Sequence, residues 1–301
     1  MNELFDKLIL RFVFTLFLCG AIFLYKYAHT FLYPTARNQL FRRFFPSKNS
    51  CDTLHLFSRI IGIGIIFSEF YFNMSDGIYL ALLDFSVDAL IASTLFLGSI
   101  YIIESIVLYN FEYNDEITKR KNFAYALVCF AHSLGMAYIV KTVIAVSQTS
   151  LVMVFFLWLF AIVLIGFATK SYSLISKLSF NRLMVQKNLA VGASYLGFIW
   201  GWSLIIASSL QHELNDIKWY SIQVILKILL SLIIIPFFKK GLVFIFNFQD
   251  DLLEKNSEGK LVNSQAELGY GVYEGAIFFT SCFLTTVITG NIHFGTFYPV
   301  F

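Results

Sequence analysis

The chain has 301 residues, of which 58% are hydrophobic and only 14% are charged, and its formal net charge is +3. A soluble domain carries roughly 25% charged residues and has no core large enough for so much apolar surface, so this composition excludes a soluble globular protein. The basic residues lie between apolar runs and form no single patch, which excludes a nucleic-acid-binding surface.

Eight apolar segments are long enough to cross a bilayer as helices. A span needs about 20 mainly apolar residues, because the hydrocarbon core is about 30 Å thick and a helix rises about 1.5 Å per residue. In chain order the segments are Leu8–Tyr33, Leu54–Phe72, Ile78–Tyr109, Phe123–Val146, Leu151–Ile175, Leu189–Leu210, Trp219–Phe238 and Leu268–Gly290. The sequence therefore predicts an all-α fold, a polytopic membrane helix bundle of about eight transmembrane helices.

The seventh segment contains a proline. Pro236 removes a backbone donor, so we expect a kink there, with residues 241–248 forming a separate short helix along the membrane surface. The charged stretch that follows, about residues 249–266, is predicted to be a cytoplasmic loop.

Charge in the links predicts the orientation. The links after the first, third, fifth and seventh segments carry most of the Lys and Arg, whereas the links Asn73–Gly77 and Ser147–Ser150 carry none. Cytoplasmic loops retain positive charge, so the basic links should lie inside the cell. Both termini are then predicted to be non-cytoplasmic.

Two short motifs indicate an internal repeat. Asn122 and Ala124 open the fourth segment, and Asn188 and Ala190 open the sixth in the same pattern 66 residues later. Each unit then holds two spans, so all copies cross the membrane in one direction, as parallel two-helix repeats. We predict four helix pairs, the first of them diverged, at residues 1–72, 73–146, 147–210 and 211–301.

The same regions resemble a known family. An acidic link, Tyr113–Ile117, precedes the Asn122 helix start, and a second acidic stretch, Asp250–Glu254, leads to Glu267–Gly275. With these motifs the chain resembles the YjfL-type bacterial inner-membrane family, a domain of unknown function in tandem copies. The resemblance implies a multi-pass protein of the bacterial inner (plasma) membrane and carries no activity over to this chain.

Small residues line one face of several segments. Helices in lipid associate through close backbone approach at such residues, because no hydrophobic drive acts between them. The predicted packing residues are Ala131, Gly135, Ala190, Ala193, Gly197, Gly201, Gly271 and Gly275. Packing inside one subunit and a contact between two copies of the chain are both open at this point.

The eighth segment has a polar face. Glu274, Ser281 and Thr285 share one side of the predicted helix. An ionisable group at membrane depth costs at least roughly 2.5 kcal/mol on insertion scales and indicates a functional site by default. The alternative is that Glu274 is neutral or bonded to a neighbouring helix and serves assembly alone.

Other polar residues fall within the predicted spans. His132, Lys227 and Glu104 complete the candidate intramembrane site, and Lys227 is the expected ion-pair partner of Glu274. Lys26, His29 and Arg59 lie near the predicted cytoplasmic boundary, where long side chains can reach water, so we assign them no role.

The sequence contains no motif of a recognised chemistry. A phosphate-binding glycine loop, an HExxH zinc site, a GxSxG nucleophile motif and a cysteine cluster are all missing, so we predict a non-enzyme without cofactor or metal. The leading hypothesis is an ion or small-solute conduit in which the polar face of the last helix meets His132 or Lys227. The alternative is a membrane scaffold or stress-response accessory protein that oligomerises and recruits a cytoplasmic protein partner. The lipid bilayer is a partner in either case.

Overall fold

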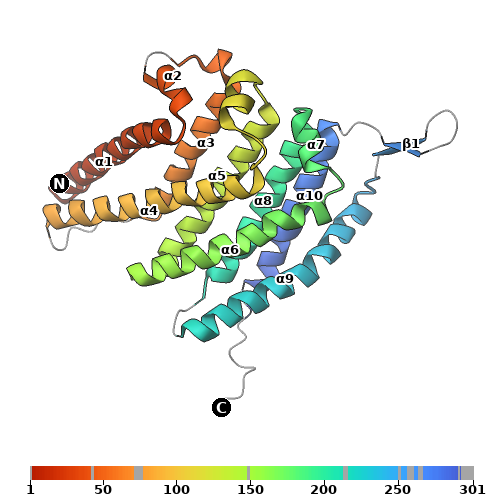
Figure 1. The fold of residues 1–301 in the computed structure, drawn as a ribbon. Coiled ribbons are helices and arrows are strands. Elements are labelled where there is room, and N and C mark those ends of the chain that lie inside the picture. The colour runs from red at the N-terminus through yellow and green to blue at the C-terminus, as the bar shows by residue number, and fades with distance from the viewer. Residues whose placement is uncertain are drawn as a thin grey trace.

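A computed structural model describes residues 2–41, 44–70, 77–147, 150–212, 216–249, 252–255, 261–263, 267–290 and 292. The helices are α1 (Asn2–Leu32), α2 (Arg37–Phe41), α3 (Ser50–Phe67), α4 (Ile78–Val107), α5 (Phe123–Val146), α6 (Leu151–Ile175), α7 (Phe180–Val185), α8 (Leu189–Leu210), α9 (Ile217–Ile245) and α10 (Leu268–Thr289) (Figure 1). Three short helical turns and two strands complete the order: η1 (Pro34–Ala36), η2 (Pro46–Lys48), η3 (Asn114–Lys119), β1 (Leu253–Lys255) and β2 (Leu261–Asn263).

Eight helices in the described residues are long and apolar enough to cross a membrane: α1, α3, α4, α5, α6, α8, α9 and α10. This confirms the predicted helical membrane bundle. In lipid every backbone donor and acceptor needs a partner within the protein, and a helix supplies those partners by itself. β1 and β2 form a small antiparallel pair between α9 and α10, outside the spans.

The spans form an inner row and an outer set. α3 contacts α5, α5 contacts α8, and α8 contacts α10, so these four helices build the core of the bundle. α5 and α8 are largely buried, whereas no more than a third of the apolar window of α1, α4, α6 or α9 is buried. The inner row can therefore hold polar side chains away from lipid.

α9 differs from the prediction. The helix runs without interruption from Ile217 through Pro236 to Ile245, so the separate surface helix at residues 241–248 was wrong. The sequence is apolar on both sides of the proline, and continuing the helix leaves only the one bond at Pro236 unmade. Of the loop predicted at about residues 249–266, residues 250–251, 256–260 and 264–266 lie outside the described residues.

The two Lys-Asn motifs build the same helix start. Lys121 and Lys187 both have positive φ, 50° and 57°, which turns the chain sharply before the helix. The side chain of Asn122 accepts hydrogen bonds from the backbone of Ala124 and Tyr125, and Asn188 accepts one from Ala190. An asparagine at this position satisfies backbone N–H groups that the first helical turn leaves unpaired.

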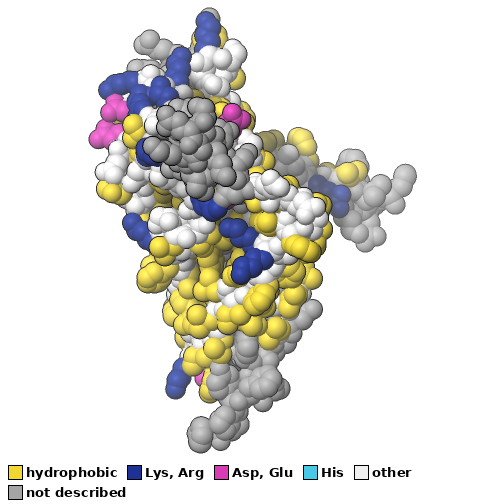
Figure 2. Space-filling view, turned by 90° about the vertical axis from the view of Figure 1, so that its right-hand side faces the viewer, with side chains coloured by type: hydrophobic (Ala, Val, Ile, Leu, Met, Phe, Trp, Pro, Cys, Tyr) yellow, Lys and Arg dark blue, Asp and Glu magenta, His cyan; other side chains and the backbone are white. Residues whose placement is uncertain are grey.

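These starts lie beside one another at one end of the bundle, which we name the basic end. Asn122 donates to the Met184 carbonyl over 3.0 Å, and Lys187 donates to the Arg120 carbonyl over 2.7 Å. Figure 2 shows dark blue Lys and Arg side chains over the upper part of one face, with a broad apolar surface below them. The basic end is the one for which the link charges predict a cytoplasmic position.

Candidate functional site

A buried ion pair joins α3 to α4. Arg59 Nη2 lies 2.5 Å from Glu104 Oε1, and the side chains are 1% and 11% exposed. Both residues belong to helices that can span the membrane. The low dielectric there strengthens their attraction, and the pairing removes most of the cost of burying either charge alone.

Helix α5 and Tyr33 complete the surroundings of the pair. Arg59 Nη1 donates to the Cys129 carbonyl over 2.9 Å and to the Ser133 hydroxyl. Tyr33, just after α1, donates its hydroxyl to Glu104 Oε2 over 3.1 Å. The guanidinium and the carboxylate are thus held by several spans, which fixes their positions.

His132 connects this pair to the second half of the chain. Its Nδ1 lies 3.9 Å from Glu104 Oε1, and its Nε2 is 3.0 Å from the Tyr195 hydroxyl on α8. The histidine is fully buried. The structure therefore brings together two of the predicted site residues, Glu104 and His132.

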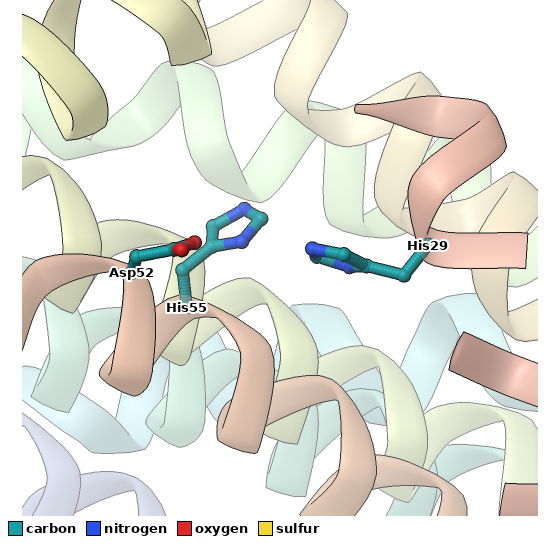
Figure 3. A group of neighbouring side chains, drawn as sticks. All are labelled: His29, Asp52 and His55. Carbon is teal, nitrogen blue, oxygen red and sulfur yellow. The ribbon is translucent and has the colours of Figure 1, made fainter. Parts of the chain in front are cut away.

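A second polar group lies closer to the basic end. Tyr113 donates its hydroxyl to Asp52 Oδ1 over 2.6 Å. Burial, followed by the negative charge of Asp52, raises the pKa of Tyr113, so the phenol stays protonated and remains a donor. His29 and His55 lie in the same group, and the ring of His29 points across toward that of His55 (Figure 3).

A cavity of about 410 Å³ opens beside the ion pair, between α1 and α4. Its wall includes Arg59, Glu104 and Ser105. The other polar members of the wall are tyrosines: Tyr25, Tyr33, Tyr101, Tyr109, Tyr113 and Tyr125. This volume lies in the roughly 300–1,000 Å³ range of small-molecule sites, and aromatic walls with a few fixed polar groups are typical of them.

Glu274 lies in a different environment. Its carboxylate accepts hydrogen bonds from Ser176 Oγ over 2.6 Å, from the Lys177 backbone N–H over 2.9 Å and from the Ser194 hydroxyl. These donors come from the end of α6 and from α8. Glu274 does not line the cavity beside Arg59.

The remaining predicted polar residues are also elsewhere. Lys227 donates to the carbonyls of Ser208 and Gly290, over 3.0 and 3.2 Å. Gly290 follows α10 and Glu274 lies in its second turn, so roughly 24 Å separates them along the helix, and the expected Lys227–Glu274 pair was wrong. Ser281 and Thr285 bond to carbonyls of their own helix.

The small-residue faces meet inside one chain. A Cβ placed on Gly197 would lie 2.2 Å from the Gly275 carbonyl oxygen, and one placed on Gly271 would lie 2.1 Å from that of Ala190. Ala193 and Gly201 face α10 along the same contact, and Gly135 of α5 packs on Ser203 of α8. Ala131 is fully buried on α5. The backbones of α8 and α10 are therefore in direct contact.

A family model matches the chain twice, at residues 3–144 and 146–289, and so covers most of its length. The chain belongs to the family described as Domain of Unknown Function (DUF350). Neither a curated protein nor a solved structure matches it.

Each DUF350 copy contains four of the spans: α1, α3, α4 and α5 in the first, and α6, α8, α9 and α10 in the second. In both copies a polar group forms where the end of the first span meets the second and fourth spans. The acid differs, because Glu104 comes from the third span and Glu274 from the fourth. The finer division into four helix pairs stays a prediction. Asn122 opens α5, the fourth span of the first DUF350 copy, whereas Asn188 opens α8, the second span of the second copy, so the two motifs do not occupy equivalent places in the copies.

His29 and Arg59 were expected to reach water at the membrane boundary, and this was wrong: each is 1% exposed and bonded within the bundle. Asp52 and His55 were missed. The spacing of Asp52, His55 and Arg59 carried a signal, because at about 100° per residue they share one face of α3 within about 60°. That polar stripe resembles the one recognised on α10.

Proposed function

We propose that this DUF350 protein is a non-catalytic, transport-type membrane protein that binds a small polar solute in the cavity beside Arg59 and Glu104. The cavity carries the proposal, because it places two fixed opposite charges and six tyrosines around an open space of about 410 Å³ at a membrane-spanning helix. Tyrosine hydroxyls bond polar groups of a solute, and the ring faces attract a cationic group.

The contacts of the polar face of α10 favour a role in helix packing over a role in solute transport. The hydroxyls of Ser281, Thr285 and Thr289 bond to their own helix, and Glu274 is already satisfied by three donors. Gly271 and Gly275 lie against the backbone of α8, which leaves no space along this face. We therefore place the polar site of the proposed transport function in the first DUF350 copy, and not on the last helix as the sequence predicted.

Filling the cavity tests the proposal. Ser105→Trp places a large ring in the cavity wall, and in proteoliposomes we expect it to lower the uptake of a transported solute at least roughly tenfold. Radiolabelled amino acids, amines and carboxylates serve as the panel of solutes.

Ser86→Trp is the matched control, because Ser86 is also exposed on α4, also bonds the carbonyl four residues earlier, and lies outside the cavity wall. Its uptake should equal that of the parent. Equal uptake by both variants, or no uptake of any solute by the parent, would contradict the proposal.

The alternative is a scaffold that recruits a cytoplasmic protein through the basic end. Lys119, Lys121 and Lys187 support it, since they lie just ahead of the neighbouring helices α5 and α8 and can attract an acidic partner. A parent that binds no solute of the panel, but retains a cytosolic protein after crosslinking that a Lys121→Glu, Lys187→Glu variant loses, would favour the scaffold.

Orientation in the bacterial inner membrane is part of the proposal. Gln186 lies at the basic end and Lys218 at the opposite end of α8 and α9, and both are exposed. In a Cys19→Ala background we expect a membrane-impermeant maleimide applied to spheroplasts to label Lys218→Cys and to spare Gln186→Cys until the cells are lysed. The reverse pattern would place the basic end outside the cell.

A further inference from the structure

We infer that His29, Asp52 and His55 form a binding site for one divalent transition-metal ion of the zinc class. One ligand atom from each residue lies within 4.8 Å of the others, and all three side chains are buried. His29 comes from the end of α1, and Asp52 and His55 from the first two turns of α3 (Figure 3). The site goes beyond the proposed solute binding and does not depend on it.

Two nitrogens in this group, His29 Nε2 and His55 Nδ1, are fully buried and have no hydrogen-bond partner among the residues that the structure describes. A buried polar atom left without a partner is destabilising, and natural proteins keep few of them. A metal ion would use the lone pair of each nitrogen and remove that cost.

His29 and Asp52 also bond to outer tyrosines, as the side chains that ligate a metal commonly bond to outer partners. The second nitrogen of His29, Nδ1, lies 3.1 Å from the Tyr25 hydroxyl, and Asp52 Oδ1 accepts from Tyr113. Such outer partners orient a ligating imidazole and fix which nitrogen carries its proton.

The donor set selects the kind of metal. Two imidazole nitrogens and one carboxylate suit zinc and its neighbours, whereas magnesium and calcium prefer oxygen ligands alone. Three protein ligands leave a fourth tetrahedral position to water.

A second cluster nearby shows the contrast. His55, Glu104 and Cys129 also lie within reach of one another, but the guanidinium of Arg59 already contacts His55 and Glu104 there. That position has its cation. Arg59 reaches the group of His29, Asp52 and His55 only at His55 Nε2, so in the described residues it pairs with neither His29 nor Asp52.

Metal binding requires two small adjustments. Ligand atoms of a tetrahedral zinc site lie roughly 3.3 Å apart, so the ligand atoms of His29, Asp52 and His55, which lie within 4.8 Å of one another, have to move closer together. His55 must then carry its proton on Nε2, so the 3.2 Å contact from Arg59 Nη2 gives way while Arg59 keeps Glu104 and the Cys129 carbonyl.

Cobalt titration tests the site. The full chain is purified in detergent through a tag without histidine, stripped with a chelator and titrated with Co²⁺, whose visible absorption reports tetrahedral nitrogen and oxygen ligation. We expect one Co²⁺ per chain, displaced by Zn²⁺. A double variant, His29→Gln with His55→Gln, should bind at least roughly 100-fold more weakly.

His212→Gln is the control, because His212 follows α8 at the opposite end of the bundle, and it should bind as the parent does. Asp52→Asn keeps an oxygen for Tyr113 while removing the charge, so its binding should fall at least roughly tenfold. Zinc should also raise the melting temperature of the parent and leave that of the double variant unchanged.

The inference is overturned if the parent binds no Co²⁺, or if the double variant and Asp52→Asn keep parent affinity. Should the double variant fail to fold, as judged by gel filtration, Asp52→Asn decides the question by its affinity alone.

Discussion

Replacing Gly271 with alanine is expected to destabilise the protein strongly. The new Cβ would lie 2.1 Å from the Ala190 carbonyl oxygen and 2.5 Å from the Ala190 Cα. These are backbone atoms of α8, so the contact is relieved only if the two helices separate. Overpacking a well-packed contact typically costs about 1–3 kcal/mol, and a clash with backbone belongs at the upper end of that range. A melting curve of the detergent-solubilised protein measures the loss.

Gly269→Ala provides the control on the same helix. No atom of the described residues lies within 4 Å of a Cβ at Gly269, so the melting temperature should stay unchanged or rise slightly, since alanine favours a helix by up to about 1 kcal/mol over glycine. Gly197→Ala should behave as Gly271→Ala does, because its Cβ would meet the Gly275 carbonyl. Equal melting temperatures for Gly271→Ala and Gly269→Ala would show that α8 and α10 are not in backbone contact.

Local patterns in the sequence predicted the features that depend on a single helix. Apolar runs located the eight spans, because span length follows from bilayer thickness alone. The Lys-Asn motifs predicted two helix starts, since capping involves only neighbouring residues. Small residues at helical spacing identified faces that do approach other helices.

Features that depend on which faces meet were harder to predict. Arg59 was placed at the membrane boundary by its sequence position, where a long side chain can reach water. In the structure α3 is covered by α5 and by the end of α1, so Arg59 is enclosed and paired. Helical periodicity shows which residues share a helix face. It does not show which helix packs against α3, or how deep in the membrane Lys227 lies relative to Glu274.

The stability of the protein should be especially sensitive to substitutions at the Arg59–Glu104 pair. Glu104→Gln removes the negative charge and leaves the guanidinium of Arg59, which is 1% exposed, without its counter-ion. Breaking a buried pair from one side typically costs about 3–5 kcal/mol, because the remaining charge is neither solvated nor neutralised. We expect Glu104→Gln to lower the melting temperature more than any substitution at the protein surface.

A more exposed ion pair offers the matched comparison. Lys141 Nζ lies 3.6 Å from Glu69 Oε2, and the two side chains are 29% and 27% exposed. Such a pair contributes at most about 1 kcal/mol, so Glu69→Gln should change the melting temperature little.

Removing both charges separates the loss of the Arg59–Glu104 attraction from the cost of leaving the Arg59 charge buried and unpaired. In the double variant Arg59→Met with Glu104→Met no unpaired charge remains, so its stability should recover much of what Glu104→Gln loses. The Arg59 contacts to the Cys129 carbonyl and Ser133 are lost in the double variant as well, which limits the recovery. If Glu104→Gln lowers the melting temperature no more than Glu69→Gln does, then water reaches Arg59 freely. In that case the tyrosine-lined cavity admits solvent down to the guanidinium.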